Sequence, residues 1–134
     1  YAHIIKADKI KAIEVYPTEE NKNPHAIWDV KDAGVTRNGN KVLVKMIAVR
    51  STFTPTDFEV KDGDEVTIAV TNIEQTTDEL HGLGLLDYNI NIVVDPGETK
   101  TVTFKAKKKG VFPYYCTNFC SALHQEMQGY MIVR

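Results

Sequence analysis

The chain ends in the segment GVFPYYCTNFCSALHQEMQGYMIVR, residues 110–134, in which two apolar stretches flank a loop rich in metal-binding side chains. Residues 111–115 and 130–133 have the β-branched and aromatic composition of strands. Between them lie two cysteines, a histidine and a methionine in the spacing C-x3-C-x3-H-x2-M. The segment therefore predicts two closing strands of a β-sheet protein, joined by a loop that can hold a metal ion.

Short strands separated by turn residues continue upstream of this segment. In residues 65–71, Val66, Ile68 and Val70 alternate with polar residues, which predicts a strand with one buried face. Pro55 interrupts another apolar stretch and indicates an edge or a bend there. The further strands are expected at residues 41–49, 53–60, 90–94 and 99–106.

The last two of these strands are predicted to pair with each other across the turn Asp95-Pro96-Gly97. Repeated short strands with turns between them indicate an all-β fold, an antiparallel β-sandwich. Residues 1–40 lack this regular pattern. We therefore expect residues 1–40 to be a connector that wraps the sandwich, and residues 41–134 to form the domain.

Length and composition fit a single globular domain. The chain has 134 residues, of which 43% are hydrophobic and 25% charged, with a formal net charge of −2. This charge gives no indication of nucleic-acid binding. No stretch approaches the roughly 20 continuous apolar residues of a membrane helix. Because the sequence starts at Tyr1 rather than at a methionine, we expect a mature form or a piece of a longer protein.

The loop holds the only two cysteines of the chain, Cys116 and Cys120, followed by His124 and Met127. Two cysteines at this spacing could form a disulfide. Zinc is a second alternative, although its usual ligand pairs are separated by a longer stretch. Thiolate, imidazole and thioether together favour copper. A single blue-copper site would use one cysteine and leave Cys120 over.

Two copper ions that share both sulfurs would need a second imidazole. His81 is the best candidate, because it leads a glycine-rich apolar stretch, residues 81–85. The backbone carbonyl of Asn118, between the cysteines, could supply a weak donor. Such a site is filled by protein ligands and lacks the open position of a catalytic metal. This closed ligand set favours electron transfer over catalysis.

The block YYCTNFCSALHQEM, residues 114–127, with His81-Gly82 upstream, resembles the CuA domain shared by nitrous-oxide reductase and cytochrome c oxidase subunit II. Gly63-Asp64-Glu65-Val66-Thr67 and Thr71-Asn72-Ile73 resemble the reductase branch, and the resemblance covers residues 25–134. It implies a cupredoxin-like Greek-key sandwich with two copper ions in a mixed-valence dinuclear CuA centre. The implied ligands are His81, Cys116, the Asn118 carbonyl, Cys120, His124 and Met127.

The resemblance further implies a periplasmic or extracytoplasmic electron-entry domain of an enzyme that reduces nitrous oxide to dinitrogen. The implied electron donor is a c-type cytochrome or a cupredoxin, and the catalytic copper cluster belongs to a separate propeller domain in a head-to-tail homodimer. The alternative is the soluble CuA domain of cytochrome c oxidase subunit II. Two residues depart from the reductase pattern: Asn118 replaces a Trp, and Glu74 replaces an Asp. We expect Glu74 to form a hydrogen bond with His81.

Overall fold

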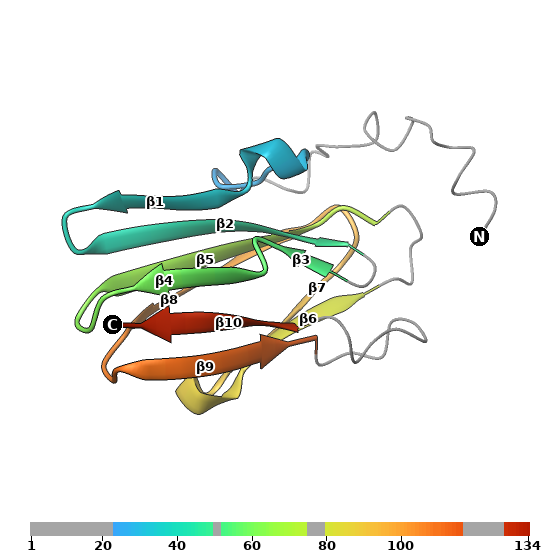
Figure 1. The fold of residues 1–134 in the computed structure, drawn as a ribbon. Helices are drawn as coiled ribbons and strands as arrows, with labels where there is room; N and C mark the ends of the chain where they lie inside the picture. Colours follow the sequence, from blue (N-terminus) through green and yellow to red (C-terminus); the bar gives the residue numbers. More distant parts are fainter. Residues whose placement is uncertain (1–22, 50–51, 75–79, 117–127) are drawn as a thin grey trace.

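The computed structural model describes residues 23–49, 52–74, 80–116 and 128–134. These residues form ten strands in two sheets that face each other (Figure 1). The strands are β1 (Gly34–Asn38), β2 (Lys41–Val49), β3 (Thr52–Thr54), β4 (Asp57–Val60), β5 (Glu65–Asn72), β6 (His81–Leu85), β7 (Ile90–Val94), β8 (Thr99–Lys105), β9 (Gly110–Tyr115) and β10 (Gln128–Val133). Two short 3-10 turns complete the elements, η1 (Val30–Asp32) and η2 (Leu86–Tyr88).

The first sheet has the order β1-β2-β5-β8, with β3 also paired to β2, and the second has the order β4-β10-β9-β6-β7. The predicted all-β sandwich is confirmed. Most neighbouring strands are antiparallel, but β2 runs parallel to β5 and β4 runs parallel to β10. Both parallel pairs join strands that are not consecutive in the chain, as crossovers between the two sheets require.

The core lies between the sheets and follows the period of two in the sequence. Val66, Ile68 and Val70 of β5 are at most 1% exposed, as the alternation predicts. They pack with residues of the opposite sheet such as Leu83 and Met131. Within the described residues, no helix is long and apolar enough to cross a bilayer.

Several strand bounds agree with the sequence-based expectation, including those of β2 and β7. The bend expected at Pro55 is present, because β3 ends at Thr54 in the first sheet and β4 begins at Asp57 in the second. The stretch predicted as one interrupted strand therefore crosses from one sheet to the other.

The predicted pairing of residues 90–94 with residues 99–106 is wrong. The first segment, β7, pairs with β6, and β8 pairs with β5 in the opposite sheet. The turn between them reverses the chain as expected, with Gly97 at a φ of +81°. However, the Gly97 N–H donates to the Asn72 carbonyl at the end of β5, at 2.8 Å, which directs the returning strand to the first sheet.

The sandwich also includes residues ahead of position 41. Strand β1 pairs with β2 through the turn at Gly39, where φ is +67°. Farther upstream, the Asn23 amide donates to the Thr101 hydroxyl of β8 at 2.8 Å, and Ile27 is only 6% exposed. Residues 23–38 thus contact the sheets directly. The connector role of residues 1–22 stays a prediction, since they lie outside the described residues.

Strands β9 and β10 pack closely against Pro55 and Thr56, where the chain crosses between the sheets. Gly129 pairs with Tyr114, whose hydroxyl donates to the carbonyls of Thr56 and Pro55. Burial raises the pKa of Tyr114, with a smaller contribution from the Asp57 charge, so the hydroxyl remains a donor. A Cβ on Gly129 would lie 1.8 Å from the Thr56 carbonyl oxygen. Only glycine fits there without a shift of backbone.

Replacing Gly129 with alanine should therefore destabilise the protein by about 3 kcal/mol or more, because the overlap involves backbone atoms that cannot rotate away. Urea denaturation measures the loss. Gln128→Ala, at an exposed position of the same strand, serves as the control and should change the free energy of unfolding by less than about 0.5 kcal/mol. Equal stability of the two variants would contradict the close approach at Gly129.

A second fixed point precedes β5, where the Asp64 side chain is only 5% exposed. Its two oxygens accept from both Arg37 Nη atoms, at 2.6 and 3.2 Å, and from the Lys61 backbone N–H at 2.7 Å. Hydrogen bonding to Arg37 lowers the pKa of Asp64, although burial opposes this effect. The bidentate pair ties β1 to the turn that starts β5.

Asp64→Asn should lower stability at neutral pH, and the difference from the wild type should shrink as the solution is acidified. A carboxyl group with a lowered pKa in the folded state stabilises fully above its unfolded pKa of about 4, and this contribution is lost progressively as the pH falls from there through the lower folded pKa. Urea denaturation between about pH 7 and pH 3 measures the effect. Glu59→Gln, which breaks an exposed pair with Arg134, is the matched control with a much smaller effect. A constant difference across this pH range would refute the assignment.

Candidate metal site

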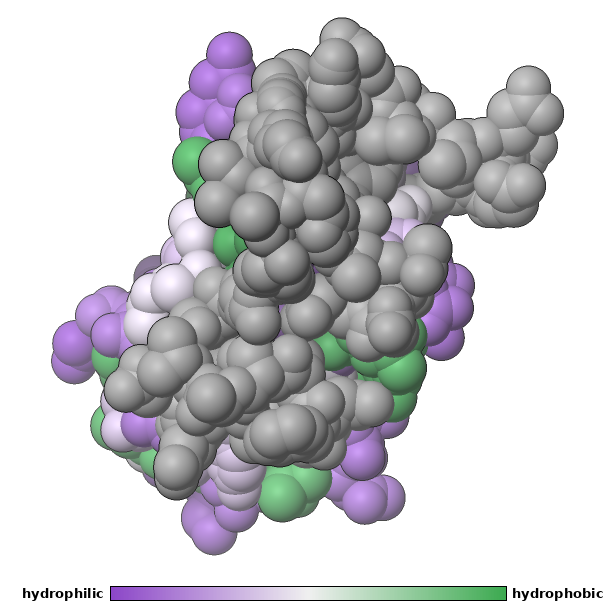
Figure 2. Space-filling model, turned by 90° about the vertical axis from the view of Figure 1, so that its right-hand side faces the viewer, coloured by the Kyte–Doolittle hydropathy of each residue, from purple (hydrophilic) through white to green (hydrophobic). Residues whose placement is uncertain are grey.

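The ends of three strands meet at one end of the sandwich. Tyr115, the last residue of β9, pairs with Gln128, the first residue of β10. It also pairs with Gly84 of β6, whose antiparallel course brings His81 toward the same end. This end is on the right in Figure 1 and faces the viewer in Figure 2, where the described side chains around it are both hydrophobic and hydrophilic.

His81 is completely buried at the start of β6. Its Nε2 lies 2.9 Å from Oε2 of Glu74, which is itself 6% exposed. The expected hydrogen bond between Glu74 and His81 is therefore confirmed. The other ring nitrogen, Nδ1, is buried and has no nitrogen or oxygen partner among the described residues. Buried polar atoms normally have a hydrogen-bond partner, so this nitrogen is a candidate to bind a sulfur or a metal ion.

Cys116, which follows β9 directly, is 3% exposed and close enough to His81 to affect its protonation. Burial lowers the pKa of His81, but the hydrogen bonds and charges of Cys116 and Glu74 outweigh it and raise the pKa from 6.5 to about 9. In the metal-free protein the ring is therefore protonated at neutral pH. A metal ion that binds there must displace this proton.

The structure thus brings together two of the six predicted ligands, His81 and Cys116. The other four predicted positions, Asn118, Cys120, His124 and Met127, lie outside the described residues. Of the aromatic residues close to the predicted ligands in the sequence, Tyr114 is buried and Phe112 packs partly against the core, whereas Tyr130 is 40% exposed. Phe119 lies outside the described residues.

The donors that are present suit a soft metal ion. A histidine that ligates a metal typically gives its other nitrogen to a carboxylate, and Glu74 occupies that place. The remaining nitrogen and a cysteine sulfur are copper or zinc ligands. In residues 23–49, 52–74, 80–116 and 128–134, no group of three or more His, Cys, Asp or Glu side chains could hold a metal ion alone. A complete site would need donors from outside these ranges, where the other four predicted ligands lie.

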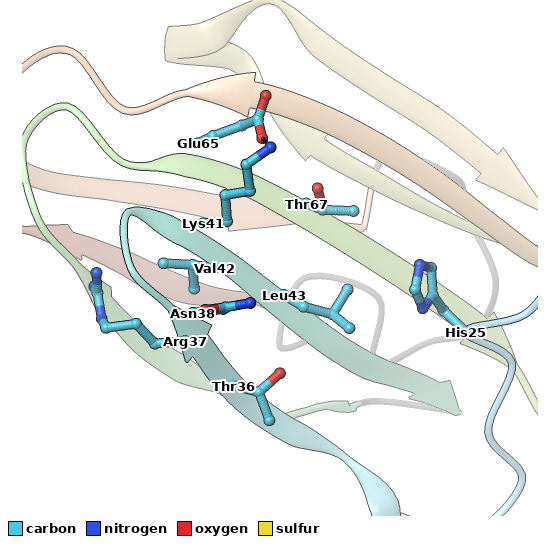
Figure 3. A pocket seen from close by; sticks show the side chains of 9 residues that line it. All are labelled: His25, Thr36, Arg37, Asn38, Lys41, Val42, Leu43, Glu65 and Thr67. Carbon is cyan, nitrogen blue, oxygen red and sulfur yellow. Dashed lines mark ion pairs between the residues drawn. The ribbon is translucent and has the colours of Figure 1, made fainter.

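A surface hollow of about 320 Å³ lies elsewhere, over β1, β2 and β5 of the first sheet (Figure 3). Its charged side chains are already paired within the protein. Lys41 is 3.4 Å from Glu65, and Arg37 is bound to Asp64. The hollow is lined by strands of the sheet that does not contain His81, so it is separate from the candidate metal site.

The fold agrees with the family that the sequence matches. The chain belongs to the cupredoxin-like domain family, which matches residues 25–133. Among individual relatives, it is 45% identical over 130 residues to nitrous-oxide reductase of Cupriavidus necator, a match that covers 97% of this chain and 20% of the relative. The chain thus spans about a fifth of the length of the nitrous-oxide reductases it matches.

The chain is also similar to cytochrome c oxidase subunit 2 of Thermus thermophilus, with 30% identity over 133 residues. This match covers 99% of the chain and 93% of the relative. Among solved structures, a chain of a heme-copper terminal oxidase dimer superposes with a TM-score of 0.65 at 25% identity, covering 99% of this chain and 94% of that one.

Glu74→Gln should lower the pKa of His81 in the metal-free protein by roughly 1 to 3, because it removes an adjacent negative charge. Titration of the His81 ring by two-dimensional ¹H-¹⁵N NMR measures the change. Glu98→Gln is the matched control, since the Glu98 carboxylate accepts from the Asp95 N–H instead. If both variants titrate like the wild type, Glu74 does not govern the protonation of His81.

Proposed function

We propose that this chain is the electron-entry domain of a nitrous-oxide reductase and holds a dinuclear CuA centre. The observation that carries the proposal is the buried His81 ring, whose Nε2 is bound by Glu74 and whose Nδ1 has no nitrogen or oxygen partner. Cys116 lies beside it, at the start of the segment that contains the other predicted donors.

The protein supplies a prearranged half of the site. Glu74 occupies Nε2, which leaves Nδ1 as the nitrogen for the metal. The pairing of Tyr115 with Gln128 fixes both ends of the donor segment 116–127 next to β6. His81, Cys116, the Asn118 carbonyl, Cys120, His124 and Met127 would hold two copper ions. When bound, this pair would accept and release one electron shared between both metals.

Electron transfer is favoured over catalysis because all the proposed positions are filled by protein donors, which leaves none for a substrate. Burial of His81 and Cys116 excludes water from the described part of the site. Exclusion of water from around a metal helps to set its reduction potential. The reduction of nitrous oxide would then take place at a copper cluster in another domain of the parent enzyme.

The proposed partners are those of an electron-entry domain. A c-type cytochrome or a cupredoxin would donate electrons, and the propeller domain of a head-to-tail homodimer would receive them. This chain covers only 20% of the Cupriavidus necator reductase. This coverage supports a parent protein with a further domain. The compartment of such an enzyme would be periplasmic.

The second candidate is the soluble CuA domain of a cytochrome c oxidase subunit II. The match to the Thermus thermophilus subunit covers 93% of that protein, which supports this alternative. The higher identity to the reductase, 45% against 30%, favours the first candidate. The gene segment upstream of Tyr1 separates them, because a reductase would encode a propeller and an oxidase subunit would encode membrane helices.

Copper loading tests the proposal directly. Electron paramagnetic resonance of the loaded protein should show one electron delocalised over two copper nuclei. Cys116→Ser and Cys120→Ser should each abolish this spectrum, because each removes a shared sulfur. Met127→Leu should retain two copper ions and change the reduction potential, because it removes a weak ligand.

Three results would contradict the proposal. One is a protein that remains colourless or binds a single copper ion per chain. Another is a delocalised spectrum that survives either serine substitution. The third is the absence of two titratable thiols in the non-reduced metal-free protein, which would indicate a disulfide between Cys116 and Cys120 and a β-sandwich binding module instead.

A further inference from the structure

We infer that Asn72 is a positioning residue for His81, acting through Glu74 at the point where the two sheets meet. The inference rests on the proposed function as far as copper is concerned, but the arrangement itself is a property of the metal-free protein. Asn72 is the last residue of β5 and is completely buried. It lies in the first sheet, whereas His81 lies in the second.

Two hydrogen bonds between the Asn72 side chain and other described residues have different consequences. Its Nδ2 donates to the Val94 carbonyl at 2.8 Å, which ties the end of β5 to the end of β7. Its Oδ1 accepts from the Glu74 backbone N–H at 2.9 Å, which fixes the chain just after the strand. One side-chain amide thus binds both a strand of the opposite sheet, at Val94, and the backbone of Glu74, the residue that binds His81.

The backbone of Asn72 is held as well. Its N–H donates to the Glu98 carbonyl at 3.0 Å, and its carbonyl accepts from the Gly97 N–H at 2.8 Å. These two bonds connect Asn72 to the turn that separates β7 from β8. The amide side chain therefore projects from a backbone that is fixed on both sides.

These contacts form a closed ring of interactions around the imidazole. Val94, which accepts from Asn72, is the residue paired with His81 across β6 and β7. Glu74, whose N–H is held by Asn72, binds His81 Nε2 at 2.9 Å. Asn72 is therefore connected to the backbone of His81 through Val94 and to the side chain of His81 through Glu74.

Without the Asn72 amide, the Glu74 N–H and the Val94 carbonyl would each lose a buried partner. The backbone at Glu74 would be released, and its carboxylate would no longer be fixed against Nε2. The direction of Nδ1 would then be less well defined. Since this nitrogen is the proposed metal donor, the effect should reach the copper site through Glu74 and His81.

The first test uses the metal-free protein with Asn72→Ala. Hydrogen exchange of the Glu74 amide should accelerate by about tenfold or more, because its acceptor is removed. The ¹⁵N resonances of the His81 ring should move as its bond with Glu74 weakens. If the alanine variant does not fold, Asn72→Ser should give the same changes, because its shorter hydroxyl cannot reach both partners.

The second test uses the copper-loaded protein. Asn72→Ala should weaken copper binding in a chelator competition by about tenfold. This is the lower end of the loss of metal affinity that follows removal of a residue that holds a metal ligand. It should also shift the reduction potential and the hyperfine pattern. In a Glu74→Ala background, Asn72→Ala should cause little further change, because the two residues act in series.

Thr71→Val is the matched control. Thr71 precedes Asn72 on β5, and its buried hydroxyl lies 2.7 Å from the Thr99 hydroxyl and accepts from the Ile27 N–H at 3.4 Å. The variant therefore loses buried hydrogen bonds as Asn72→Ala does, but none to Glu74. It should lower stability and leave the Glu74 amide, the His81 ring and the copper spectrum unchanged.

Equal effects of Thr71→Val and Asn72→Ala on these probes, or independent effects of Asn72 and Glu74, would overturn the inference. A wild-type protein that binds no copper would overturn the proposed function instead. The response of the Glu74 amide and the His81 ring in the metal-free protein would then still support the positioning role.

Discussion

The structure depends on one constraint, the burial of an imidazole ring that has Glu74 as its only nitrogen or oxygen partner among the described residues and lies beside the Cys116 thiol. A buried polar atom without a partner costs free energy, and a sequence that keeps one needs a compensating partner. Glu74 supplies that partner for Nε2 of His81, and the position beside Cys116 is left for another. The rest of the sandwich can be understood as the scaffold that holds this ring and this thiol together.

The scaffold does so by strand register. The pairs Tyr115 with Gln128 and Tyr115 with Gly84 bring three chain segments to one end of the second sheet. This register is protected by the close approach of Gly129 to the carbonyl of Thr56, with the Tyr114 hydroxyl bonded to the same carbonyl. A shift by one residue would place a side chain where only glycine fits, and would also reverse the two faces of the strand.

Much of this could be predicted from residue types and spacing. The alternation of Val66, Ile68 and Val70 predicts the buried face of β5, and the acidic Glu74 near His81 predicts their hydrogen bond. Strand β1 was missed because its sequence, GVTRN, is short, mostly exposed and without an alternating pattern. The pairing of β7 with β8 was wrong because a turn predicts reversal but not which sheet the chain joins.

The hydrogen bonds of Asn72 could not be predicted in the same way, because they depend on contacts between distant segments. Only the short spacing from Asn72 to Glu74 indicates a local hydrogen bond.

The two ends of β5 have different roles: the residues at its start contribute to stability, and the residue at its end also supports the candidate metal site. Before its first residue, Asp64 binds Arg37 and Lys61, and this arrangement stabilises the join between β1 and β5. At its last residue, Asn72 supports Glu74 and through it His81. Because the strand runs in full extension between them, substitutions near Asp64 can change the free energy of unfolding while the imidazole stays in place. Substitution of Asn72 itself cannot do so, since the amide that joins the sheets also holds the backbone of Glu74. The proposed metal site is therefore also constrained by Asn72, a residue of the sheet that does not contain His81.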